Sequence, residues 1–92
     1  MDVFAQMASK IIKEQQAIIG PVAFEQARKV PGLQVDEKKN EVVLEGNEKE
    51  ILAKLVEKYQ HLFGQASVEV CKDAVRNMLS QVPPDSIPAL LK

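Results

Sequence analysis

The chain has 92 residues, the size of one small domain with a modest hydrophobic core. Its 12 lysines and arginines nearly balance 13 aspartates and glutamates, and the formal net charge at pH 7 is −1. This balance argues against nucleic acid or an anionic membrane as a partner, because binding to either needs an excess of basic residues on one face. The single cysteine excludes an intramolecular disulfide and a cysteine cluster for zinc.

Apolar residues recur at helical spacing over residues 2–19, which predicts a first amphipathic helix. Glu14 and Gln15 interrupt the apolar arc at one turn. Two interpretations of Gln15 are open: the helix leaves the cover of the core here, or Gln15 is a buried hydrogen-bonding residue that fixes the register of a partner. The acid at position 2 and the lack of a long apolar run indicate that the segment is not a signal peptide.

Gly20 and Pro21 interrupt the helical pattern. Glycine adopts the left-handed conformation that ends a helix, and proline suits the first position of the next helix. The chain is therefore expected either to turn or to kink sharply here, before a second short helix that ends ahead of Pro31 and Gly32. An anion site at this corner is not favoured, because one glycine is not a glycine-rich loop and no Lys-Ser/Thr pair follows.

Residues 33–45, "LQVDEKKNEVVLE", alternate in polarity on either side of a polar turn, which predicts a β-hairpin. Within the turn, Asn40 is suited to a left-handed conformation. Val43 points to the opposite sheet face from Val42 and Leu44, so one packed face does not account for all three apolar side chains.

Two longer helices are expected after the hairpin. Asn47 is a good N-cap, Glu50 follows it at capping-box spacing, and Gly64 is expected to end this helix. The residues predicted to fill its core arc are Ile51, Leu52, Leu55, Val56, Tyr59, Leu62 and Phe63. Ser67 is expected to cap the last helix. The apolar stripe of that helix is Val70, Cys71, Ala74, Val75, Met78 and Leu79.

The order helix, helix, hairpin, helix, helix and tail predicts an α+β domain with helices packed on a small antiparallel sheet. The chain is expected to form a single domain, 1–92, with a core over residues 1–82 and a tail over residues 83–92. The tail is too short to form a stable helix alone.

No constellation of residues in the sequence indicates catalysis. Cys71 and His61 are the only candidates for a nucleophile and its base, but helical wheels place Cys71 in an apolar stripe and His61 opposite the core. One histidine cannot assemble a metal site, and the carboxylates lie on exposed faces beside lysines. We therefore expect no enzyme activity, no cofactor and no metal site.

The hairpin edge and the tail are the expected interaction surface. A lone two-stranded hairpin presents unpaired backbone groups, which proteins usually cover or pair. Two arrangements are open: the tail covers the hairpin of its own chain, or two chains pair across a two-fold axis as a homodimer. The candidate interaction residues are Val43, Ile87, Leu90, Leu91 and Gln15.

Two runs carry a resemblance to known proteins. Residues 13–33, "KEQQAIIGPVAFEQARKVPGL", and residues 62–74, "LFGQASVEVCKDA", resemble a family of small uncharacterised bacterial proteins of cyanobacterial type. The first run is also similar to IGPxA-bearing helical segments of bacterial signalling proteins. The resemblance implies a bacterial cytosolic protein in a regulatory setting, and it carries over no functional residue because neither run has a catalytic motif.

The function that the sequence favours is a non-catalytic, cytoplasmic interaction or regulatory module. It would act through self-association or by docking on a signalling protein. The alternative is a small-ligand or nucleic-acid binding protein whose site forms only in an oligomer. A membrane partner is not expected, because no segment approaches the roughly 20 apolar residues of a membrane span.

Overall fold

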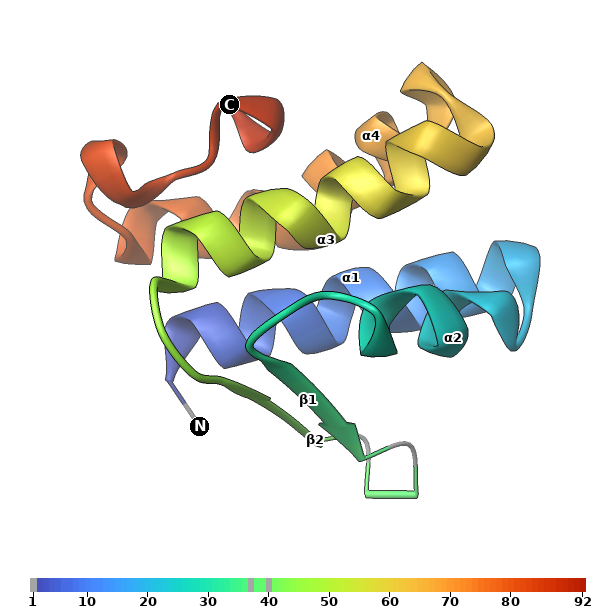
Figure 1. Ribbon diagram of the computed structural model, residues 1–92. Helices are drawn as coiled ribbons and strands as arrows, with labels where there is room; N and C mark the ends of the chain where they lie inside the picture. Colours follow the sequence, from blue (N-terminus) through green and yellow to red (C-terminus); the bar gives the residue numbers. More distant parts are fainter. Residues whose placement is uncertain (1, 37, 40) are drawn as a thin grey trace.

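The computed structural model describes residues 2–36, 38–39 and 41–92. Within these residues, the main elements in chain order are α1 (Val3–Ile19), α2 (Val22–Arg28), β1 (Leu33–Asp36), β2 (Glu41–Leu44), α3 (Glu48–Phe63) and α4 (Gln65–Val75) (Figure 1). Three short 3-10 segments complete the chain, η1 (Arg76–Gln81), η2 (Pro84–Ser86) and η3 (Ala89–Leu91). The predicted α+β fold, with its helix-helix-hairpin-helix-helix order, is confirmed.

Helix α1 is the centre of the fold. It begins at Asp2, whose side chain accepts a hydrogen bond from the Ala5 amide at 2.8 Å and so caps the helix. The helix contacts α2, α3, α4 and strand β2. Its buried residues are Ala5, Met7, Ala8, Ile11, Ile12 and Gln15. The amphipathic pattern of the sequence therefore marks the buried face from Met7 to Ile12. It is wrong for Ile18, an apolar residue of the same predicted pattern, which is 64% exposed.

Two glycine corners redirect the chain. Gly20 has φ +73°, and its amide donates to the Gln16 carbonyl at 2.9 Å, so the chain turns rather than kinks before α2. Gly64 has the same φ, and α4 begins directly after it. The prediction that Ser67 caps α4 is therefore wrong. Ser67 lies buried in the first turn, because Gly64 already ends α3 and starts α4.

We expect Gly20→Val to lower the free energy of unfolding by about 1 kcal/mol or more, because a β-branched residue is strained at positive φ. A Cβ atom at this position meets no other atom within 4 Å, so the loss would come from the backbone alone. Urea denaturation measures the change. A variant as stable as the unmodified chain would contradict the left-handed corner.

The hairpin is antiparallel, with Leu33 opposite Leu44 and Val35 opposite Val42. Leu33 and Val42 are buried, while Val43, on the other face, is 52% exposed. Helix α1 contacts β2, and α2 contacts β1, so one face of the sheet packs on these two helices. The predicted left-handed conformation of Asn40 falls outside the described residues.

Helix α3 begins as predicted, with the Asn47 side chain accepting a hydrogen bond from the Glu50 amide at 3.0 Å. Its core arc is buried from Ile51 to Tyr59. The prediction is wrong for the last turn, where Leu62 and Phe63 are 46% and 48% exposed. They lie directly before the Gly64 corner, in the last turn of the helix.

The last ten residues are part of the packed core. Ile87, Pro88 and Leu91 are buried, and η3 contacts α3 and α4. Lys49 donates to the Asp85 carbonyl at 2.7 Å and ties η2 to the start of α3. The predicted division at residue 82 therefore does not describe the packing. The tail also does not cover the hairpin: it lies on the opposite side of the helices (Figure 1).

Candidate functional site

The five predicted interaction residues do not form one surface. Ile87 and Leu91 lie in the core, where they cover α3 and α4, so their side chains are not available to a partner in this structure. Leu90 is half-buried. Gln15 is 1% exposed, whereas Val43 alone among the five presents a mostly exposed side chain. The sequence identified the apolar residues but not the element that each of them covers.

Gln15 joins two helices of the same chain. Its side-chain amide donates to the Ser67 carbonyl at 3.1 Å and to the Cys71 sulfur at 3.4 Å. The interpretation that the helix leaves the cover of the core at this turn is therefore wrong. Gln15 is the buried hydrogen-bonding residue of the second interpretation, and the element whose position it fixes is α4 of its own chain.

Cys71 and His61 are placed apart, as the helical wheels predicted. Cys71 is fully buried, while His61 is exposed on α3. Burial raises the pKa of the Cys71 thiol from 9.0 to about 11, although the hydrogen bond from Gln15 opposes the shift. A thiol with such a pKa stays protonated at neutral pH, which does not suit a nucleophile.

Cys71 is therefore expected to react slowly with iodoacetamide at neutral pH in the folded chain and at the ordinary rate in urea. Because the folded-state pKa is raised, the stabilising effect of the protonated thiol is complete below pH 9 and is lost between pH 9 and about 11. Cys71 should contribute a fall in stability of about 1.4 kcal/mol per pH unit across this window, which urea denaturation measures as the difference between the unmodified chain and Cys71→Ala. Fast labelling of the folded chain would contradict the buried thiol.

In the described part of the chain, no group of three or more His, Cys, Asp or Glu side chains is arranged to hold a metal ion. Among the helices of the same residues, none has the length and apolar character needed to cross a membrane.

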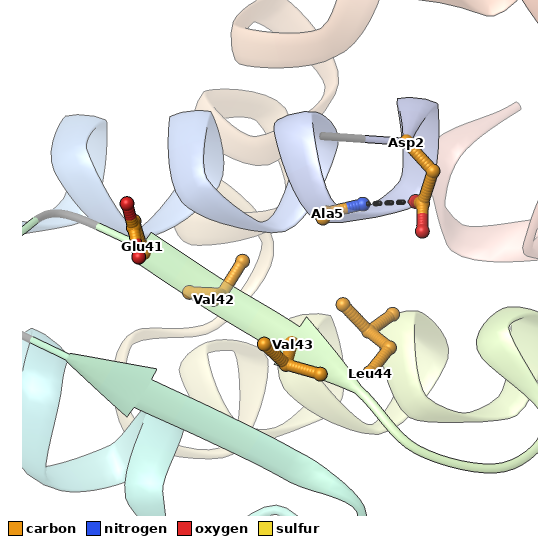
Figure 2. A pocket seen from close by; sticks show the side chains of 6 residues that line it. All are labelled: Asp2, Ala5, Glu41, Val42, Val43 and Leu44. Carbon is orange, nitrogen blue, oxygen red and sulfur yellow. Dashed lines mark hydrogen bonds between the residues drawn. The ribbon is translucent and has the colours of Figure 1, made fainter.

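A groove lies between the start of α1 and the outer edge of β2 (Figure 2). We name it the β2-edge groove. Its volume is about 350 Å³. Its lining residues are Asp2, Ala5, Glu41, Val42, Val43 and Leu44. Figure 2 shows the side chains of Val42 and Leu44 pointing toward α1, while Val43 points away from it. The strand therefore offers its backbone edge to the groove.

The backbone pairing decides which groups face this groove. The Glu45 amide donates to the Gly32 carbonyl at 2.7 Å, so these two residues form a hydrogen-bonded pair of the ladder. Hydrogen-bonded pairs alternate with non-hydrogen-bonded pairs along an antiparallel ladder. Counting back two residues from Glu45, Val43 is therefore the next β2 residue whose backbone bonds to β1. It follows that the N–H and C=O groups of Val42 and Leu44 point away from β1, toward the groove.

The groove is acidic at the end nearest Asp2. Desolvation raises the pKa of Glu48. The negative charge of Asp2 and a hydrogen bond with the Asp2 side chain raise the pKa of Glu48 further, because these two carboxyl groups lie close together. Glu45 follows β2 at the same end, where it accepts a hydrogen bond from Gln34 at 3.0 Å. No basic side chain is among the lining residues of the described chain. Lys38 and Lys39 lie at the other end of β2, in the turn.

The alternation of the hairpin pointed to Val43, but nothing in the sequence pointed to Asp2. Asp2 is a local helix cap, and only the packing of α1 beside β2 brings it to the sheet edge. In comparisons with protein-family models, with curated proteins and with solved structures, no match to this chain was found.

Proposed function

We propose that this protein is a non-catalytic interaction module that binds an extended segment of a regulatory or signalling protein in the cytoplasm. The segment adds to β2 as a further strand. One observation carries the proposal: the outward backbone groups of Val42 and Leu44 face an open groove, and no strand occupies that edge among the described residues. Main-chain hydrogen bonds supply affinity in this mode of recognition, and alternate side chains supply specificity.

The charges around the groove indicate the chemistry of the partner. Asp2 and Glu48 make the Leu44 end of the strand acidic. A segment with apolar or β-branched residues at its centre and a basic residue over Asp2 matches this arrangement. Val43, on the open face of the sheet, would contact every second side chain of the added strand.

A second copy of the chain fits this edge poorly. Two β2 strands could pair in antiparallel fashion only through the outward backbone groups of Val42 and Leu44. Hydrogen bonds then join Val42 of one copy to Leu44 of the other, and the two-fold axis passes beside Val43. Glu41 of each copy then lies opposite Glu45 of the other, on the same face as Val43. Like charges directly opposite each other destabilise a strand pair. The edge therefore favours a different, basic partner segment.

The test is a titration of the isotope-labelled chain with two blocked heptapeptides, followed by nuclear magnetic resonance. Both peptides alternate threonine and valine, one with a lysine at each end and the other with a glutamate at each end. We expect the lysine peptide to shift the amide resonances of Val42 and Leu44 and to slow hydrogen exchange at Leu44. The glutamate peptide should bind at least about tenfold more weakly.

Two variants make this test specific. Asp2→Asn keeps a side chain that caps α1 but removes the charge, so it should weaken lysine-peptide binding without loss of stability. Leu44→Pro removes an outward N–H while leaving the bonds to β1 in place, and it should abolish binding. Equal binding of both peptides, or shifts confined to other parts of the chain, would contradict the proposal.

A further inference from the structure

We infer that a hollow between α2 and α3 binds a small organic phosphate, a phosphate monoester that carries an apolar group. We name this surface the α2–α3 hollow. Its volume is about 500 Å³, compared with about 350 Å³ for the β2-edge groove. Its basic lining residues are Lys54, Lys58 and His61. None of its lining residues belongs to the β2-edge groove, and the inference does not depend on the proposed function.

The packing of two helices forms this hollow. Helix α3 supplies one wall, and Gln26 of α2 supplies the other together with Pro31, in the turn after α2. Helices α2 and α3 contact each other (Figure 1). Lys54, Lys58 and His61 are separated by four and three residues on α3, which places their side chains on one helix face. The position of α2 therefore turns a basic face of α3 into the wall of a hollow.

The charge of the hollow selects an anion. Within the described chain, neither Lys54 nor Lys58 forms an ion pair. Glu57 is the one acidic residue of the lining among the described residues, so two ammonium groups against one carboxylate leave a net charge of +1. Protonation of His61 adds to this positive charge. The two ammonium groups are therefore available to an anionic ligand.

A phosphate monoester matches the number and type of these basic groups. At pH 7 it carries a charge of about −1.5 to −2, and three of its oxygens are strong hydrogen-bond acceptors. Lysine binds phosphate as a point charge on a long, flexible stem, so Lys54 and Lys58 can converge on one phosphate group. An imidazole N–H of His61 can donate to the third oxygen. A monocarboxylate, with one charge and two oxygens, engages this set less fully.

The apolar part of the lining indicates that the phosphate is attached to an organic group. Leu62 is 46% exposed, and it lines the hollow together with Pro31. An apolar group beside the phosphate would remove both side chains from water. Pockets for small molecules have volumes of about 300–1,000 Å³, whereas a stable protein interface needs roughly 20–30 residues on each side. The size of the hollow therefore suits a small molecule and not a protein.

The test is a titration of the isotope-labelled full chain with phenyl phosphate at neutral pH, followed by nuclear magnetic resonance. Lys54 and His61 are exposed, so the hollow is open and we expect a dissociation constant of about 0.1 to 1 mM. The amide resonances of Lys54, Lys58 and His61 should shift. Inorganic phosphate lacks the apolar group, benzyl alcohol lacks the charge and benzoate has a single charge. Each should bind at least about threefold more weakly than phenyl phosphate.

Three variants and a matched control locate the site. Lys54→Gln and Lys58→Gln should each weaken phenyl phosphate binding at least about threefold, because each removes one positive charge from the hollow. Leu62→Ser should weaken phenyl phosphate binding to a similar degree but leave inorganic phosphate binding unchanged. The control is Lys13→Gln, since Lys13 is an exposed lysine of α1 that lies outside this lining and has no ion pair within the described chain. It loses the same charge and should bind like the unmodified chain.

Circular dichroism checks that each variant is folded, and the two lysine variants serve as independent tests should one of them fail to fold. Equal binding of phenyl phosphate and benzoate would overturn the assignment to phosphate. Equal weakening by Lys13→Gln and by the two lining variants would show that only the total charge of the chain matters, and it would overturn the site. So would shifts confined to residues away from the hollow. Lysine-peptide binding at the β2-edge groove should be the same in Lys54→Gln as in the unmodified chain, so failure of either proposal leaves the other standing.

Discussion

Leu91→Ala is expected to lower the free energy of unfolding by about 2–5 kcal/mol, the range for removing a fully buried leucine side chain from a core. Leu91 is 1% exposed although it is the second-last residue of the chain. Its segment, η3, contacts both α3 and α4. The loss would be a large part of the stability of a domain of this size, because small domains have only a modest reserve.

Leu90→Ala is the matched control for this prediction. Leu90 is the same residue type at the neighbouring position, but it is half-buried, so its truncation should cost clearly less than that of Leu91. Urea denaturation of both variants measures the two changes. Equal, small losses would show that the C-terminal segment is only loosely docked and that α3 and α4 do not depend on it.

Gly32→Ala is the second substitution with a large expected effect, a loss of about 2–3 kcal/mol. Gly32 has φ +84°, which strains any residue with a side chain. An added Cβ atom would also lie 2.6 Å from the Glu45 carbonyl oxygen and 2.9 Å from Cδ1 of Ile51. The backbone contact is the more serious one, because Gly32 and Glu45 are a hydrogen-bonded pair of the hairpin.

The comparison with Gly20→Ala isolates the effect of this close contact. Gly20 has a similar φ of +73°, but a Cβ atom there meets nothing within 4 Å, so its replacement should show only the backbone strain. Thermal and urea unfolding of the two variants measure the difference. If both variants lose the same stability, the close approach of β2 to Gly32 is not a determinant of the fold.

The sequence by itself determined the local elements of this protein. The capping residue Asn47 and the glycines at 20 and 64 act on the backbone within a few positions, so their effects can be read without knowing the fold. The 3.6-residue and two-residue periods of hydrophobicity likewise gave the helices and strands in the correct order. The last helix is shorter than its predicted stripe, because α4 ends at Val75 and both Met78 and Leu79 lie in the 3-10 segment η1. The alternation of the second strand also identified Val43 as the apolar side chain left on the open face.

Only the tertiary structure decided which elements cover one another. Gln15 interrupts an apolar arc, and its burial depends on α4 supplying the Ser67 carbonyl, 52 residues away in the chain. Phe63 continues the arc of α3 in the pattern, yet the Gly64 corner turns the chain away before anything covers it. Leu91 is buried only because the last segment folds back onto α3 and α4. Hydrophobic burial is non-directional, so periodicity marks the apolar face of an element but cannot specify the neighbour that covers it.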